Sequence, residues 1–169
     1  MQLEITVAGQ DDLKTLDAFV DEIQSSKDPE YFIAQYERQV AGDRQIMLGF
    51  VEGKLVCYCV LNWAPKYAYY KKMGYPEIQD LNVLPDFRGQ GIATQMIDKC
   101  EGLALEKGRT HMGISVGLTA SYGPAQRLYV KLGYVPDGHG VTCDRQSVAH
   151  GDFRPVDDDM CLMMVKDLI

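Results

Sequence analysis

Residues 81–93 constrain the fold of this chain more than any other part of its sequence. A β-favouring run ends at Pro85, Gly89 and Gly91 follow, and an amphipathic helical pattern then begins. Proline cannot donate to a sheet ladder, and glycine readily adopts left-handed turns, so this order predicts a strand, a tight turn and a helix. A chain with such a unit must bury a helix against a sheet.

Hydrophobic periodicity predicts the other elements, and the period changes along the chain. Helical spacing follows Asp11 or Asp12 and again Asp28-Pro29, whereas the β-favouring runs on either side of Glu52-Gly53-Lys54 indicate a hairpin. Two further helices are expected to start near residues 93 and 124, and the polar stretch 137–157 shows no regular pattern. The predicted strands cover residues 2–8, 45–51, 55–63, 77–84, 112–118 and 160–165.

These elements predict one α/β domain over residues 1–169. Hairpins in the first half and alternating strands and helices in the second favour a mixed, mostly antiparallel central sheet with flanking helices. A length of 169 residues is within the range of a single domain. The proportions of 46% apolar and 24% charged residues are those of an ordinary globular protein.

Charge and cysteine usage argue against several function classes. The chain has 24 acidic and 17 basic residues and a net charge of −7, which disfavours nucleic acid as a partner. No apolar run has the roughly 18 residues of a membrane span, and the first residues lack a signal-peptide pattern. Without an apolar span, no membrane partner is expected. The five cysteines include no CxxC pair and the histidines lack ligand spacing, so a reduced, cytoplasmic protein without a metal site is predicted.

The glycine-containing turn has the chemistry of an anion site. A helix start leaves N–H groups unpaired and carries roughly half a positive elementary charge. Gly89, Gly91 and Ala93 are small enough to let a phosphate approach the backbone, and Arg88 can add a charge-assisted contact. The chain has no P-loop motif, and Thr94 stands where a dinucleotide fingerprint needs a third small residue, so neither of these phosphate sites is expected.

Two motifs together resemble the GNAT superfamily of N-acetyltransferases. Residues 88–93 match its (Gln/Arg)-x-x-Gly-x-(Gly/Ala) signature, and Val83-x-Pro85 precedes them at the usual spacing. Residues 125–134 match its Ala-x-x-Leu-Tyr-x-x-x-Gly-(Phe/Tyr) segment, although Tyr122 stands where many members have Asn. The resemblance implies a GNAT-like fold and transfer of an acetyl group from acetyl-CoA to an amine.

The resemblance also implies how acetyl-CoA, the cosubstrate, is held. Main-chain N–H groups of Gln90, Gly91, Ala93 and Thr94 would hold the pyrophosphate. Two residues of a strand that splays from its neighbour would pair with the pantetheine arm. The implied cofactor-binding residues are Leu81, Val83, Arg88, Gly89, Gln90, Gly91, Ala93 and Thr94.

Two residues are candidates for proton transfer. Tyr129 matches the family tyrosine near the thioester sulfur and is the candidate acid, although residue chemistry alone favours a packed core tyrosine. Glu77, where some members carry a catalytic glutamate, is the candidate base, with a solvated glutamate as the alternative interpretation and Asp80 as the fallback base. No Cys or Ser is paired in sequence with a recognisable base, which favours direct transfer in a ternary complex.

The expected acceptor is a small cationic amine, because the negative net charge weakly favours cations. The aromatic residues 63–75 form either one wall of the acceptor site or a hairpin that packs on the domain. Residues 160–165 are a candidate for an exposed terminal strand that pairs in a homodimer. The alternatives are a non-catalytic module that binds or senses acyl-CoA, a protein or peptide amine acetyltransferase, and another nucleotide-binding domain.

Overall fold

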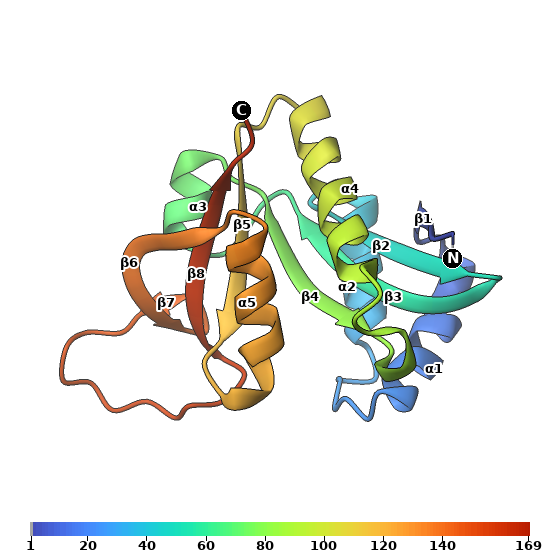
Figure 1. Cartoon of the computed structure of the whole chain (residues 1–169), viewed down its shortest axis with the longest axis horizontal. Coiled ribbons are helices and arrows are strands. Elements are labelled where there is room, and N and C mark those ends of the chain that lie inside the picture. Colours follow the sequence, from blue (N-terminus) through green and yellow to red (C-terminus); the bar gives the residue numbers. More distant parts are fainter. Residues whose placement is uncertain (1) are drawn as a thin grey trace. The chain divides into compact units, whose positions relative to one another are not determined.

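The computed structural model describes residues 2–169, and these residues form strands and helices that alternate along much of the chain (Figure 1). The strands are β1 (Glu4–Val7), β2 (Arg44–Val51), β3 (Lys54–Asn62), β4 (Glu77–Val83), β5 (His111–Gly117), β6 (Val135–Cys143), β7 (Gln146–Ser147) and β8 (Met160–Asp167). The helices are α1 (Leu13–Glu22), α2 (Tyr31–Val40), α3 (Ala68–Met73), α4 (Ile92–Glu106) and α5 (Gly123–Lys131). Within this described part of the chain, no helix is long and apolar enough to cross a membrane.

The chain forms two compact units, and each unit is built from two separate stretches. The first unit contains the residues up to Trp63 and Ile78–Gly102, and the second contains Ala64–Glu77 and Leu103–Ile169. The strand order is β1-β2-β3-β4 in the first unit and β5-β8-β6-β7 in the second. The pairs β1–β2, β2–β3, β5–β8, β8–β6 and β6–β7 are antiparallel. The predicted mixed α/β, mostly antiparallel fold is therefore confirmed.

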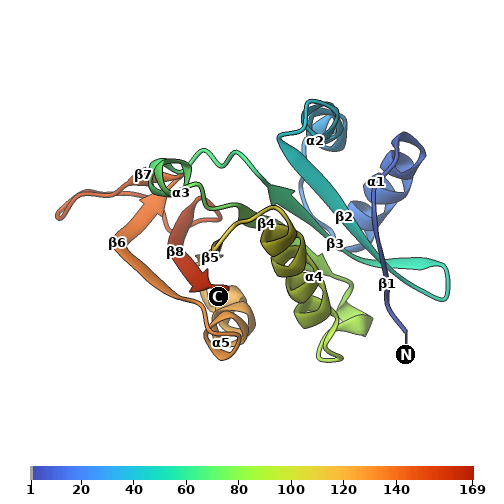
Figure 2. The same ribbon diagram turned by 90° about the horizontal axis from the view of Figure 1, so that it is seen from above.

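In the first unit, α1 and α2 cover one face of the sheet and α4 covers the other (Figure 2). The ring of Tyr58 on β3 meets the edges of Phe19 and Phe32, from α1 and α2, at centroid separations of 5.2 and 5.4 Å. On the opposite face, the sulfur of Cys59 lies 3.7 Å from the sulfur of Cys100 on α4. This alternation is the period-two pattern of a strand buried on both faces.

In the second unit, α3 packs closely on β5 and β8. The side chain of Tyr70 on α3 is fully buried, and its hydroxyl donates to the main-chain carbonyl of Met164 on β8. Gly113 of β5 leaves the room for this ring, because a β-carbon at that position would overlap it. This strand glycine, which no sequence motif marks, therefore allows α3 to approach β5 closely.

Two regions differ from the sequence-based expectation. The helix α3 forms inside the aromatic stretch 63–75, where six helical residues are too few to show a period. In the stretch 137–157, β6 continues as far as Cys143, but it leaves β8 in a bulge between Pro136 and Val141. Gly138 and Gly140 in this bulge have φ angles of 84° and 79°, so the strand lacks the regular alternation by which a sequence reveals it.

The expected dimerisation strand is not an edge strand. The last strand, β8, pairs with β5 along one side and with β6 along the other. Its backbone N–H and C=O groups are thus used within the unit, and an edge is what pairing between subunits needs. The prediction that residues 160–165 form an exposed terminal strand is wrong.

Candidate functional site

The turn before α4 contains two left-handed glycines. Gly89 and Gly91 have φ angles of 71° and 80°, and a β-carbon at either position would meet no atom within 4 Å. Any other residue would cost about 1–2 kcal/mol in this backbone conformation. The open space beside the glycines means that a large group can approach the main chain closely.

The start of α4 presents N–H groups that the helix itself does not use. The N–H of Gln95 donates to the carbonyl of Gly91, four residues earlier, at 3.1 Å. Ala93 and Thr94 come before Gln95, so their N–H groups have no carbonyl acceptor within the helix. They lie at the positive end of a 15-residue helix, which carries roughly half an elementary charge. Together with the open glycine backbone, this arrangement suits a pyrophosphate.

Two side chains brace the turn against the end of β4. Arg88 donates from Nε to the carbonyl of Val83 at 3.0 Å, and Gln90 donates from Nε2 to the carbonyl of Asp86 at 2.9 Å. The residue Arg88 is exposed, so its charge stays beside the turn while it holds the strand end. Leu81 and Val83, the predicted contacts of the pantetheine arm, are half-buried on β4.

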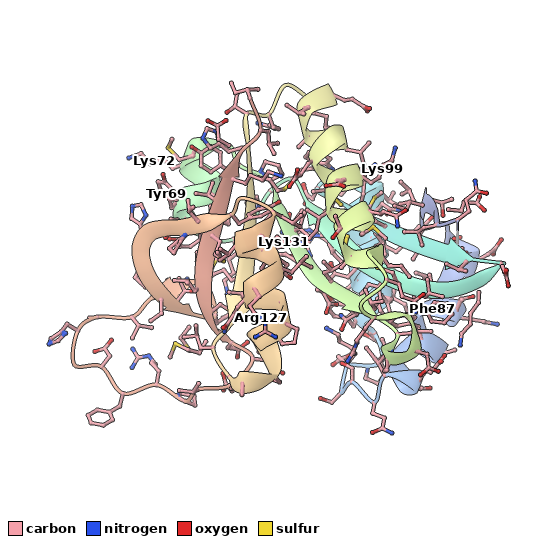
Figure 3. The ribbon with its side chains drawn as sticks, in the orientation of Figure 1. Tyr69, Lys72, Phe87, Lys99, Arg127 and Lys131 are labelled. Carbon is pink, nitrogen blue, oxygen red and sulfur yellow. The ribbon has the colours of Figure 1, made fainter. Side chains whose placement is uncertain are left out.

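Tyr129 lies on the buried face of α5 and is 7% exposed. Its ring centroid is 6.2 Å from that of Tyr134, which follows the helix. The N–H of Tyr134 donates to the carbonyl of Tyr129 at 3.0 Å, across Gly133 with a φ of 95°. This glycine-dependent helix end holds the two rings together. On the outer face, Arg127 and Lys131 are exposed one turn apart (Figure 3).

Glu77, the candidate base, is fully buried in an ion pair. Its Oε1 accepts a hydrogen bond from Nη2 of Arg145 at 2.9 Å, and the same nitrogen lies 3.3 Å from Oγ of Ser115. Burial opposes the charge of Arg145, but the Glu77 carboxylate outweighs this effect and raises the pKa of Arg145. The expected alternative of a solvated glutamate is wrong.

The sequence does not identify Arg145 as the partner of Glu77. Arg145 follows Asp144 in the turn between β6 and β7, and both have positive φ angles, of 62° and 47°. Lys66 binds Asp144 at 2.9 Å on the exposed side of this turn. No local motif marks Arg145, because its role depends on a residue 68 positions away.

Asp80 is the centre of a polar cluster in the first unit. Its φ angle of 52° interrupts the extended backbone of β4, which is uncommon for a residue other than glycine. Its carboxylate accepts four hydrogen bonds, from Lys27 Nζ, Tyr31 Oη and Tyr58 Oη at 2.8 Å each and from Asn82 Nδ2 at 2.9 Å. Burial first, and then the Asp80 carboxylate, raise the pKa of Tyr58, so its hydroxyl stays protonated and donates.

The aromatic stretch is mostly core. Tyr67, Tyr70 and Tyr75 are buried together with residues of β8, and the hydroxyl of Tyr67 donates to Asp137 at 2.7 Å. Tyr69, labelled in Figure 3, is partly buried. Its ring centroid lies 4.2 Å from that of His139. Packing against the domain is therefore confirmed for three of the four tyrosines, but the predicted hairpin is wrong, because the stretch forms the helix α3.

The fold and the turn define a class of protein. A mixed α/β chain that joins a sheet strand to a helix through an open glycine turn is built to hold a phosphate-bearing ligand at the helix start. Residues 13–134 match the model of the acetyltransferase (GNAT) family. The chain belongs to this family, and the resemblance carried by its two motifs is confirmed.

The chain is also similar to individual N-acetyltransferases. An uncharacterized N-acetyltransferase from Archaeoglobus fulgidus is 33% identical over 76 residues, which are 44% of this chain and 50% of the relative. The match thus spans about half the length of that curated relative. The PaiA N-acetyltransferase from Thermoplasma acidophilum, in complex with coenzyme A, has a TM-score of 0.65 at 16% identity over 99% of both chains.

A second solved structure has the same fold. A chimera of the spermidine N-acetyltransferase from Vibrio cholerae and hSSAT has a TM-score of 0.71 at 14% identity. The similarity covers 99% of this chain and 96% of the chimera. At such identities the two structures establish the shared fold.

Proposed function

We propose that this protein is an acetyl-CoA-dependent N-acetyltransferase that transfers the acetyl group directly to a small cationic amine. The observation that carries the proposal is the turn before α4, where Gly89 and Gly91 leave the backbone open beside unused N–H groups. Acetyl-CoA supplies an acetyl group activated as a thioester, and its pyrophosphate matches this turn. The coenzyme A complex of the PaiA enzyme, which has the same fold, supports this choice of donor.

Residues of β4 and of the turn are proposed to hold the donor. Leu81 and Val83 offer main-chain groups to the pantetheine arm, and Arg88 adds positive charge. The main-chain N–H groups proposed for the pyrophosphate are those of Gln90, Gly91, Ala93 and Thr94.

Tyr129 is the proposed acid. It gives its hydroxyl proton to the sulfur as the carbon–sulfur bond breaks and the bond between the amine nitrogen and the carbonyl carbon forms. Its nearly complete burial and its contact with the Tyr134 ring support this role, because they fix the direction of the phenol. An acid held in one direction loses little entropy during the transfer.

Glu77 is the proposed base, and Asp80 is the alternative. An ammonium group cannot attack a carbonyl, so the acceptor must lose a proton before or during the attack. Oε1 of Glu77 lies 2.9 Å from Nη2 of Arg145 in an ion pair, and a carboxylate can accept a proton. Because Glu77 has no exposed surface, the proton must reach it through a hydroxyl such as that of Ser115 or through a water.

The cysteines support direct transfer. Cys57, Cys59, Cys100 and Cys161 are buried, and burial followed by the effect of Cys100 raises the pKa of Cys57 to about 12. A thiol with such a pKa stays protonated, whereas the thiolate is the nucleophile. Cys57 is therefore a poor site for an acyl-enzyme.

The acceptor is proposed from charge. The net charge of −7 raises the concentration of cations near the protein, and the Asp80 carboxylate already holds an ammonium group, that of Lys27. The spermidine N-acetyltransferase chimera, a protein of the same fold, is named for a cationic acceptor.

A thiol-release assay tests the reaction. Acetyl-CoA is offered with polyamines, aminoglycosides, free amino compounds and peptide N-termini, at low and then at physiological ionic strength. A cationic small amine should have the highest kcat/KM, and its kcat/KM should fall as salt screens the charge. A higher kcat/KM for a neutral or anionic acceptor, without salt dependence, would refute the proposed acceptor class.

The same assay separates the enzyme from a sensing module. A non-catalytic acyl-CoA-binding protein would bind acetyl-CoA and release no thiol with any amine. Dissociation constants for acetyl-CoA, NAD and ATP, measured side by side, distinguish the donor from other nucleotides.

The rate–pH profile tests the base. Glu77→Gln should abolish the acidic limb of this profile, and a retained limb would exclude Glu77 as the base.

A further inference from the structure

An ammonium group of the protein itself occupies the Asp80 cluster. Nζ of Lys27 lies 2.8 Å from Oδ1 of Asp80, and it lies 4.5 Å from the ring centroid of Tyr31. Lys27 comes from the segment between α1 and α2, and Asp80 comes from β4, 53 residues later. A carboxylate together with an aromatic face is the combination that binds a primary ammonium by charge, hydrogen bonds and cation–π attraction.

The other residues of the cluster orient the carboxylate. The hydroxyls of Tyr31 and Tyr58 both donate to Oδ2, and Asn82 donates to Oδ1, the atom that also accepts from Lys27. These three donors would stay in place if Lys27 moved away. The positive φ of Asp80 is a strained conformation, and such strain persists where the surrounding contacts overdetermine it.

The contact with Lys27 can open without unfolding. The side chains of Lys27 and Asp80 are 24% and 16% exposed, so water reaches the ion pair. Because water can solvate the two charges as they separate, opening this ion pair costs less than opening a fully buried one. A second ammonium with the same donors can therefore compete for Asp80.

We propose that Asp80, Tyr31 and Tyr58 form a binding site for a primary ammonium group of the acceptor, and that Lys27 fills this site in the free protein. The proposal rests on the proposed function and narrows its substrate class to amines with two or more ammonium groups. One ammonium displaces Lys27 at Asp80, and another amino group is the one acetylated. Lys27 thereby acts as an internal competitor that lowers the apparent affinity for such amines.

Calorimetry with 1,4-diaminobutane, in the absence of acetyl-CoA, tests the proposal. Lys27→Met removes the competing charge and keeps an unbranched side chain. If Lys27 fills the site for about nine-tenths of the time, Lys27→Met should bind the diamine about tenfold more tightly than the wild type. Lys27→Arg keeps a competing cation and should bind like the wild type. The double variant Lys27→Met with Asp80→Asn should lose this tenfold gain in affinity for the diamine.

Lys54→Met is the matched control. Lys54 forms an ion pair of 2.9 Å with Glu22 in the same unit, so its loss removes one charge and one ion pair in the same way. Its diamine affinity should equal that of the wild type. An unchanged or weaker affinity of Lys27→Met, or an equal gain in Lys54→Met, would overturn the proposal.

A labelling experiment on the wild type makes the test independent of how the variants fold. An amine-reactive reagent is applied with and without the diamine, and the ratio of modification at Lys27 to that at Lys54 is measured by mass spectrometry. The ratio should rise several-fold when the diamine displaces Lys27, and a constant ratio refutes the displacement. Both experiments omit acetyl-CoA, so a failed acetyl transfer and a failed ammonium site give different results.

Discussion

Nη2 of Arg145 lies 2.9 Å from Oε1 of Glu77, and the Glu77 side chain has no exposed surface. The pair joins the first residue of β4 to the turn between β6 and β7, and Ser115 of β5 lies within reach of the same guanidinium. A buried carboxylate needs such a partner, because an uncompensated charge in the interior is strongly unfavourable. The proposed base and the conformation of this turn therefore depend on one contact.

Removal of Arg145 should be strongly destabilising. Arg145→Met leaves the Glu77 carboxylate buried without a countercharge, which should lower the free energy of unfolding by about 3–5 kcal/mol. Lys66→Met, which breaks the exposed ion pair with Asp144 in the same turn, is the control and should change little. Urea denaturation measures both. Equal losses in the free energy of unfolding would show that the buried ion pair contributes no more stability than the exposed one.

The glycine turn should be required for binding of acetyl-CoA. Gly91→Val places a side chain in the open space beside the backbone, so it should weaken acetyl-CoA binding and reduce the thermal shift that the ligand produces. Gly53→Val is the matched control, because Gly53 has a φ of 79°, also lies in open space, and belongs to the hairpin turn. Both variants should melt at a lower temperature than the wild type. Loss of the ligand-induced shift in both, or in neither, contradicts the assignment.

Tyr129→Phe separates a catalytic tyrosine from a packed one. The variant keeps the ring beside Tyr134 and removes the proton, so kcat should fall about a hundredfold while the melting temperature stays nearly unchanged. Tyr134→Phe is the comparison at the neighbouring ring and should retain activity. An active Tyr129→Phe enzyme would return Tyr129 to a purely structural role.

Gly113 and Gly102 should respond to alanine in opposite ways. A β-carbon at Gly113 overlaps the buried ring of Tyr70, so Gly113→Ala should cost about 1–3 kcal/mol of stability. Gly102 lies within α4, where a β-carbon meets no atom within 4 Å, so Gly102→Ala should add about 0.5–1 kcal/mol through helix propensity. Denaturant unfolding gives both values, and the same sign for both would contradict this packing.

The sequence by itself determined the features that depend on near neighbours. Pro85 ends β4, the left-handed glycines form the turn, and apolar spacing starts α4, so the backbone of residues 88–94 could be predicted, and the proposed anion site rests on that backbone. The hairpin of β2 and β3 has the same origin, because Glu52 and Gly53 both adopt positive φ in a two-residue turn. In each case the backbone conformation is set by steric limits within a few residues of chain.

Only the tertiary structure decided which partners the two candidate bases have. Glu77 meets Arg145 across 68 residues, and Asp80 meets Lys27 across 53 and Tyr58 across 22. Such pairings follow from strand order and from the side of a sheet on which a helix lies, and local periodicity contains neither. For the same reason β8, which looks in sequence like a free terminal strand, lies between β5 and β6, because the backbone groups of a buried strand are satisfied by whichever strands the topology places beside it.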